Sequence, residues 1–155
     1  MNRITTRRAT LADCEILTDI CLRSKQSNGY DEAFMRACRA ELSVTPTTFA
    51  TNEIWVAERQ SKPLGCAALC EGRHPQEGEV SLFFIDPDAQ KQGIGRILWD
   101  CLQTAALERK MQSLTLCADP NAVPFYEKIG FKVTSQSPSL SIPGRMLPFM
   151  ERDIP

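Results

Sequence analysis

The stretch QKQGIGR, residues 90–96, follows an apolar run that ends at Asp86-Pro87 and precedes a strongly periodic helical segment. It combines glycines with two cations, Lys91 and Arg96. The first backbone N–H groups of a helix have no acceptor within the helix, and the helix dipole adds positive charge at that end. Glycine lets an anion come close to those amides. The stretch therefore predicts an anion site that can hold a diphosphate; a strand-to-helix turn without a ligand is the alternative.

Two well-known phosphate loops do not fit this stretch. It lacks the GK[ST] ending of a nucleoside-triphosphate loop, so the lysine and the hydroxyl ligand for magnesium are missing where they are needed. It also lacks the third glycine of the dinucleotide fingerprint, because Leu98 holds that position, and it lies too late in the chain to open such a domain. An unrelated nucleotide-binding protein is therefore the least favoured interpretation.

Length and charge narrow the class of protein. A chain of 155 residues is the size of one ordinary domain, and we expect a single domain over residues 1–155. The formal net charge is −1, without a basic stripe, which argues against a nucleic-acid or anionic-membrane surface. The N-terminus lacks the apolar core of a signal peptide, and no apolar span approaches the length of a membrane helix. We therefore expect a cytoplasmic protein whose partners are small molecules or protein.

Cysteine and histidine usage argues against a disulfide framework and against a metal site. The seven cysteines are odd in number, none forms a CxxC pair, and most lie in apolar periodic segments. We interpret them as small buried hydrophobic residues in a reducing compartment. Because His74 is the only histidine, a zinc site would depend on scattered cysteines, and we expect no metal.

Alternation and periodicity predict an α/β (α+β) fold with one mixed central sheet flanked by helices. The strand at 78–85 is expected to be buried on both faces near its end, and Gly130 is expected to end the last helix. The predicted strands are 3–8, 53–59, 63–72, 78–85, 113–118, 131–136 and 145–153, and the predicted helices are 11–21, 31–42, 94–108 and 121–129.

Each of the first three helices has a predicted core face. Trp99 lies off the face of its helix, so we expect it to cover an edge or to join a dimer contact, whereas Trp55 is expected in the core. The expected core residues are Leu11, Cys14, Leu17, Ile20 and Cys21 in the first helix, Phe34, Ala37, Cys38 and Leu42 in the second, and Ile94, Ile97, Leu98, Cys101, Leu102 and Ala105 in the third.

The second half of the chain resembles the GNAT superfamily of N-acetyltransferases. The segment LFFIDPDAQKQGIGRILWDCL fits the family's Q/R-x-x-G-x-G/A pattern through Gln90, Gly93 and Gly95. After a buried strand, NAVPFYEKIGF fits its second pattern, at residues 125–131. The resemblance covers about residues 78–134 and implies a mostly antiparallel sheet of about seven strands, while the first half agrees only in the order of its elements.

For the donor, the resemblance implies acetyl-CoA. A strand ending at Phe84-Ile85 would pair with the pantetheine arm like an added strand. Asp119 is interpreted as a helix cap, and Asn121 either contacts the coenzyme or simply lies in the first helical turn. The residues that would cradle the diphosphate are Gln90, Lys91, Gln92, Gly93, Ile94, Gly95 and Arg96.

For the chemistry, acyl transfer to an amine needs a base, an oxyanion donor and an acid for the departing thiolate. The resemblance implies that Tyr126 is the acid and that the N–H of Phe84 or Ile85 meets the oxyanion. Glu79 is the first choice for the base, although Ser81 stands where some relatives carry the glutamate. The alternatives for the base are Glu71 and His74.

The acceptor amine is expected to enter between the loop after the first helix and the loop between the last two strands. Tyr30 and Arg145 are its expected polar contacts, and Arg145 can hold a substrate carboxylate. The predicted function is transfer of an acetyl group from acetyl-CoA to a primary amine of a small molecule or peptide, by direct attack in a ternary complex. The alternative is a non-catalytic sensor that binds acyl-CoA. The acceptor, the acyl length and a possible homodimer stay open.

Overall fold

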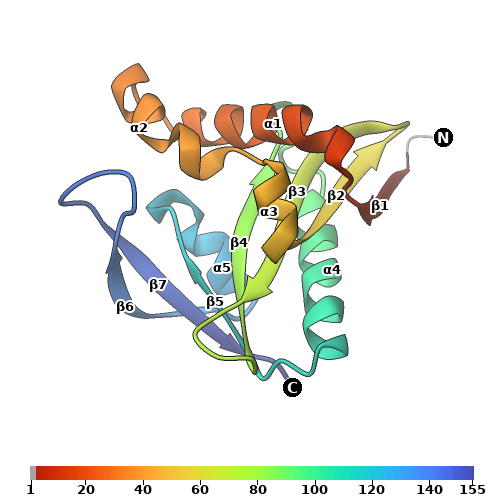
Figure 1. Ribbon diagram of the computed structural model, residues 1–155, viewed down its shortest axis with the longest axis vertical. Helices are drawn as coiled ribbons and strands as arrows, with labels where there is room; N and C mark the ends of the chain where they lie inside the picture. Colours follow the sequence, from red (N-terminus) through yellow and green to blue (C-terminus); the bar gives the residue numbers. More distant parts are fainter. Residues whose placement is uncertain (1–2) are drawn as a thin grey trace.

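The computed structural model describes residues 3–155, which form one seven-stranded sheet with helices on both faces (Figure 1). The strand order is β1-β2-β3-β4-β5-β7-β6, and every neighbouring pair is antiparallel except β4 and β5. The strands are β1 Ile4–Arg8, β2 Glu53–Arg59, β3 Lys62–Glu71, β4 Glu77–Ile85, β5 Ser113–Cys117, β6 Lys132–Pro138 and β7 Met146–Asp153. The helices are α1 Cys14–Gln26, α2 Glu32–Leu42, α3 Pro46–Thr51, α4 Ile94–Glu108 and α5 Val123–Lys128.

The predicted fold class and all seven predicted strands are confirmed, with ends that differ by at most two residues. The short helix α3 was not predicted, because six residues starting at Pro46 are too few to show a helical period. Its start is typical nevertheless, since the proline occupies the first turn and Thr45 and Thr48 cap each other. Gly130 does end the last helix, and its φ of +101° explains why glycine stands there.

Two hydrophobic cores lie on opposite faces of the sheet. One is shared with α4 and α5, and the other with α1 and α2. On α1 the predicted Leu11 is exposed instead, because the α-helix begins only at Cys14. On α2 the predicted Cys38 and Leu42 are buried, but the predicted Ala37 is exposed and Met35 is buried in addition. The helical period was therefore correct, and the core face of α2 includes Met35 in place of Ala37.

Trp99 corrects a further expectation. It is only 3% exposed and packs edge-to-face on Phe131, with ring centroids 5.4 Å apart. The guanidinium of Arg152 lies 5.1 Å from its ring centroid. Trp99 therefore belongs to the core between α4 and the sheet, where the apolar stripe of α4 is wider than the predicted one, and Trp55 is only partly buried.

The sheet opens between β4 and β5, as Figure 1 shows. Their pairing covers only Glu77 to Glu79 on β4, opposite Ser113 to Thr115 on β5. An irregularity in the β3–β4 pairing follows at once, since Leu82 and Val80 face consecutive residues of β3 and Ser81 bulges out. The last residues of β4 are half-buried, not buried on both faces as predicted, because β5 has diverged from them.

Candidate active site

A cavity of about 490 Å³ lies where β4 and β5 separate. Its floor is β4 from Glu79 to Ile85, and its walls come from β5, α5 and the ends of α1 and α2. The loop between β6 and β7 closes it on a further side. The predicted site residues that line it are Glu79, Phe84, Ile85, Gln90, Asn121, Tyr126 and Arg145.

The register of β4 decides which of its amides face the opening. Asp86 donates its N–H to the carbonyl of Leu64 at 2.7 Å, so this residue pair is hydrogen-bonded across β3 and β4. Antiparallel partners alternate, and the N–H of Phe84 therefore also points to β3. The amides of Phe83 and Ile85 point the other way, toward the side that β5 has left. This geometry favours Ile85 over Phe84 as the predicted oxyanion donor and adds Phe83.

The predicted anion loop lies at the start of α4. Gly93 adopts φ +80° with open space where a side chain would be, and Ile97 donates the first helical hydrogen bond to its carbonyl at 3.2 Å. The amides of Ile94, Gly95 and Arg96 therefore have no acceptor inside the helix. Ile94 is buried, so it can offer a ligand only its backbone. This end of α4 has the donors that a diphosphate needs.

The loop's side chains point to different surroundings. Gln90 lines the cavity, and Lys91 and Arg96 are exposed. Gln92 accepts a hydrogen bond from Arg59 at 2.6 Å, outside the cavity wall. Before the loop, Asp86 accepts two hydrogen bonds from Arg23 of α1 at 2.7 and 3.0 Å, and this lowers its pKa. The pair fixes α1 against the turn that leads into the loop.

Gly95 is needed for packing. A Cβ at this position would lie 2.9 Å from Cε1 of Phe125, closer than side chains normally approach. The ring of Phe125 also packs against Phe83 and Tyr126, with centroids 5.4 Å away in both cases. Glycine therefore lets α4 and α5 come together at the cavity wall.

Tyr126 is buried on α5, among three aromatic rings, and lines the cavity. Among residues 3–155 its hydroxyl has no hydrogen-bond partner, so the one proton that it can donate is not used within the protein. Burial, together with the negative charge of Asp119, raises the pKa of Tyr126 well above its ordinary value. The hydroxyl therefore stays protonated at neutral pH and can donate its proton to a group in the cavity.

Glu79 is the last residue of β4 that pairs with β5, and it lines the cavity. Desolvation, with a smaller effect of the nearby Glu77, raises the pKa of Glu79. Within the described part of the chain no cation pairs with it. The alternatives, Glu71 at the end of β3 and His74 in the following turn, do not line the cavity. Of the three residues named for the base, only Glu79 lines the cavity.

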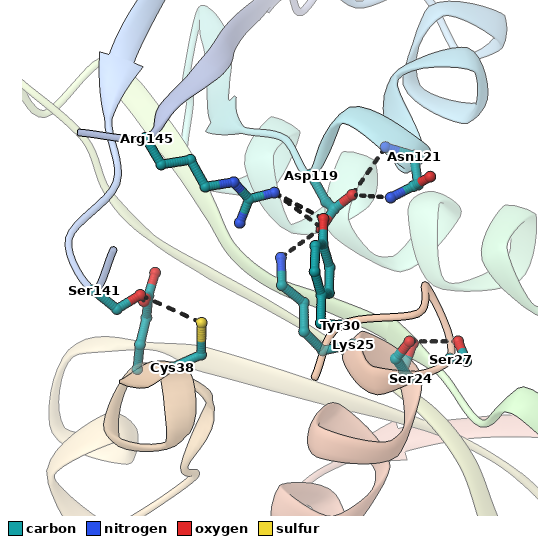
Figure 2. A network of polar contacts seen from close by, with 10 residues as sticks. Ser24, Lys25, Ser27, Tyr30, Cys38, Asp119, Asn121, Ser141 and Arg145 are labelled. Atoms are coloured by element: carbon teal, nitrogen blue, oxygen red, sulfur yellow. Dashed lines mark hydrogen bonds and ion pairs between the residues drawn. The ribbon is translucent and has the colours of Figure 1, made fainter. Parts of the chain in front are cut away.

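Asp119 is the centre of a polar network that joins three segments of the chain (Figure 2). Its Oδ2 accepts hydrogen bonds from Lys25 at 2.6 Å and from the hydroxyl of Tyr30 at 2.8 Å. Arg145 donates to the hydroxyl of Tyr30 at 2.8 Å and lies 3.7 Å from Asp119. Burial alone would raise the pKa of Asp119, but the hydrogen bonds to Lys25, Asn121 and Tyr30 lower it to about 2.

The other carboxylate oxygen of Asp119 orients Asn121. It accepts from the backbone N–H of Asn121 at 2.9 Å, which confirms Asp119 as a cap, and from the side-chain Nδ2 at 2.8 Å. Because Nδ2 is held in this way, the side-chain oxygen of Asn121 is left to accept a hydrogen bond from another group (Figure 2). Asn121 therefore presents an acceptor at the cavity wall.

The loop between β6 and β7 is tied to α2. Ser141 donates a hydrogen bond to Glu41 and lies 3.5 Å from the sulfur of Cys38. The guanidinium of Arg145 lies 5.1 Å from the ring centroid of Tyr30 and 4.9 Å from that of Phe34. These contacts close one side of the cavity with segments that are far apart in the sequence.

Lys25, Glu41 and Phe83 are cavity residues that sequence reasoning missed. Phe83 was hidden by register, since only the pairing with β3 tells which amides of β4 point outward. Lys25 and Glu41 gave no local signal, because their partners stand 94 and 100 residues away. The seven cysteines are free, but only Cys21, Cys38 and Cys66 are buried as predicted, and Cys117 is exposed in the cavity wall.

Known proteins share this sequence pattern and fold. The model of the acetyltransferase (GNAT) domain matches residues 22–140. The peptidyl-lysine N-acetyltransferase YjaB of Salmonella typhimurium is 34% identical over 139 residues, which are 86% of this chain and 87% of that protein. YjaB of Escherichia coli is 37% identical over 87 residues, about half of each chain at 54% and 52%.

Solved structures agree with the fold. The PaiA N-acetyltransferase of Thermoplasma acidophilum, in complex with coenzyme A, superposes with a TM-score of 0.77 at 18% identity, over 97% of this chain and 99% of that one. A GCN5-related N-acetyltransferase of Rhodopseudomonas palustris gives 0.78 at 21% identity, over 99% and 97%. No helix within residues 3–155 is long and apolar enough to cross a membrane. Because the family model spans most of the chain and agrees with the fold and the α4 loop, the protein belongs to the GNAT family of N-acetyltransferases.

Proposed function

We propose that the protein transfers the acetyl group of acetyl-CoA directly to a primary amine while both substrates are bound. The observation that carries the proposal is the cavity at the open end of β4. It brings together outward-facing amides, a protonated buried tyrosine and an unpaired carboxylate. With these groups in one space, the amine can attack the thioester without an acetyl-enzyme intermediate.

For the donor, the amides at the start of α4 would bind the diphosphate, and Lys91 and Arg96 would add charge. The pantetheine arm would follow the unpaired edge of β4, and the free oxygen of Asn121 would accept one of its amide protons. The thioester oxygen would then lie near the N–H of Phe83 or Ile85, where negative charge develops in the transition state.

For the chemistry, the amine must lose a proton and the departing sulfur must gain one. A primary amine with a pKa of about 10.4 is only about 0.04% neutral at pH 7. Glu79 would accept the amine proton, directly or through water, and its raised pKa makes it a better base than an ordinary carboxylate. As the C–N bond forms and the C–S bond breaks, Tyr126 would donate its proton to the thiolate and later regain one from solvent or Glu79.

For the acceptor, the similarity to the peptidyl-lysine N-acetyltransferase YjaB supports a lysine side chain in a peptide. A small-molecule amine fits the same chemistry. We also expect a cytoplasmic location, which the free thiols support. The absence of nucleic-acid and membrane partners and a possible homodimer stay predictions; burial of Trp99 removes the residue suggested for a dimer contact.

The test combines binding and turnover. A calorimetric titration with acetyl-CoA should show binding in the micromolar range, and an assay of released thiol should show turnover on at least one primary amine. Binding without thiol release on any amine would instead favour a coenzyme-A sensor. Failure to bind acetyl-CoA would contradict the proposal. Ping-pong kinetics, with release of thiol before the amine is added, would contradict direct attack.

A further inference from the structure

The charged side chains of the cavity wall indicate what kind of amine it accepts, provided that the proposed function holds. Five charged residues line the cavity, and three of them are carboxylates. Which of these charges a substrate meets depends on which are already paired inside the protein. The five charged residues are Lys25, Glu41, Glu79, Asp119 and Arg145.

Both cations are already committed to Asp119. Lys25 forms a 2.6 Å ion pair with it, and the two side chains are only 13% and 12% exposed. Arg145 donates to Tyr30 and lies 3.7 Å from Asp119 (Figure 2). The rings of Tyr30 and Phe34 lie close to its guanidinium. A carboxylate on the acceptor would approach Arg145 beside the negative charge of Asp119. That charge makes the predicted carboxylate contact of Arg145 less favourable.

The two other carboxylates, Glu79 and Glu41, form no ion pair with a cation in the described part of the chain. Glu79 lies on the floor of the cavity, and its raised pKa agrees with the absence of a neighbouring positive charge. Within residues 3–155 Glu41, in the last turn of α2, receives only the hydrogen bond of Ser141. Two carboxylates from different walls thus face the cavity without a paired cation, and the wall as a whole carries one more negative than positive charge.

We propose that the acceptor is a primary amine that carries a second positive charge. Glu79 would receive the reacting amine, and Glu41 would attract the distal cation, so Glu41 is the residue that determines specificity. A free diamine or polyamine has this chemistry, and so does a lysine next to another basic residue in a peptide. An amine with a nearby carboxylate, such as a free amino acid, would be selected against.

A matched series of four-carbon amines tests this proposal on the wild-type protein. The compounds are 1,4-diaminobutane, butylamine and 4-aminobutanoate, whose distal groups are positive, neutral and negative. We expect kcat/KM from thiol release to fall by about 10-fold at each step, beyond the roughly twofold advantage of two equivalent amines. The preference should weaken with added salt, because the cavity is open to solvent.

The Glu41→Gln variant tests the residue. The preference for 1,4-diaminobutane over butylamine, taken as a ratio of kcat/KM, should fall about 5- to 10-fold. Glu32→Gln removes the same charge from the same helix, outside the cavity, and should keep the wild-type ratio. Peptide amides that contain Lys-Arg or Lys-Glu then separate the two sources. A higher kcat/KM for the Lys-Arg peptide than for 1,4-diaminobutane would identify a peptide acceptor. A higher kcat/KM for 1,4-diaminobutane would identify a free polyamine.

The results distinguish a failure of this inference from a failure of the proposed function. If 4-aminobutanoate is the best of the three amines, or if Glu41→Gln and Glu32→Gln change the ratio equally, the inference is wrong while the proposed acetyl transfer stands. If no amine of either series releases thiol although acetyl-CoA binds, the proposed function fails, and the inference fails with it.

Discussion

The proposed donor side and the proposed acceptor side of the cavity are built in different ways. The donor side uses backbone amides from one continuous stretch, the end of β4 and the start of α4. The acceptor side uses side chains from α1, α2 and two distant loops, with contacts such as Tyr30 to Arg145 across 115 residues. Backbone donors depend on local conformation, whereas the acceptor side depends on tertiary packing. The two sides should therefore respond differently to substitution.

The largest expected effect concerns Tyr126, which lies between the two sides. Tyr126→Phe removes the acid for the thiolate but keeps the ring and its packing. We expect kcat to fall by about 10²- to 10³-fold, the usual range for loss of a general acid. Steady-state thiol release measures this effect.

Binding provides the control for that substitution. Calorimetry should give Tyr126→Phe the same affinity for acetyl-CoA as the wild type, because the donor side contributes backbone groups that the change does not touch. An unchanged kcat across the pH range would show that Tyr126 is only a packed aromatic residue, and would remove it from the mechanism.

Glu79→Gln should lower kcat/KM by about 10- to 100-fold, since the acceptor then depends on solvent to lose its proton. The raised pKa of Glu79 moves the acid limb of the wild-type pH profile above the range of an ordinary carboxylate, because the base must be ionised. In the variant this limb should disappear. The stability of the protein should not fall, because ionised Glu79 is desolvated without a cation to compensate it.

The matched substitution Glu71→Gln distinguishes proton transfer from a general loss of charge. Glu71, at the end of β3, faces Gly78 where β4 is still paired with β5, and it lies outside the cavity. A loss of activity in Glu71→Gln equal to that in Glu79→Gln would contradict the assignment of the base. Retention of the acid limb in Glu79→Gln would contradict it as well.

The same contrast explains what the sequence could predict. The strands and helix α4 follow from local patterns, and these were predicted nearly to the residue. The burial of Met35 instead of Ala37 on α2 and the burial of Trp99 were not predicted, because they depend on what packs against each helix. The choice between Phe84 and its neighbours needed the register with β3. On the acceptor side Tyr30 and Arg145 were named, but their shared partner Asp119 was interpreted only as a cap.

Asp119→Asn tests whether the acceptor side is held together by charge. The variant leaves Lys25 nearly buried without its partner, so we expect a loss of about 2 kcal/mol in the free energy of unfolding at pH 7. The pKa of Asp119 is lowered from 3.8 to about 2 in the folded protein, so its stabilising effect is present above about pH 4 and is lost as the pH falls toward 2. Urea unfolding between pH 7 and 3 should show the gap between the two proteins closing.

Two further variants test whether the effect of Asp119 comes from its charge. Asp100→Asn makes the same chemical change in an exposed pair with Arg96, at 3.8 Å, and should cost less than about 0.5 kcal/mol. Adding Lys25→Met to Asp119→Asn removes the unpaired cation and should recover part of the loss. A gap that stays constant with pH would mean that the effect of Asp119 comes from capping and not from its charge.

The smallest expected effect is on the donor side, at Gly95. An alanine there would place its Cβ 2.9 Å from the ring of Phe125, and this ring would have to move toward the cavity. Alanine also favours the helix by about 1 kcal/mol over glycine, which offsets the strain, so stability should change little. The affinity for acetyl-CoA should fall by about 10-fold, as calorimetry would show, because the donor path narrows between β4 and α5.

Gly144→Ala is the matched control: it strains the β6–β7 loop at φ +81° but has open space around it, so acetyl-CoA should bind it as it binds the wild type. Equal losses of affinity in both variants would mean that the two sides of the cavity are coupled, and the separation of donor backbone from acceptor side chains would not hold.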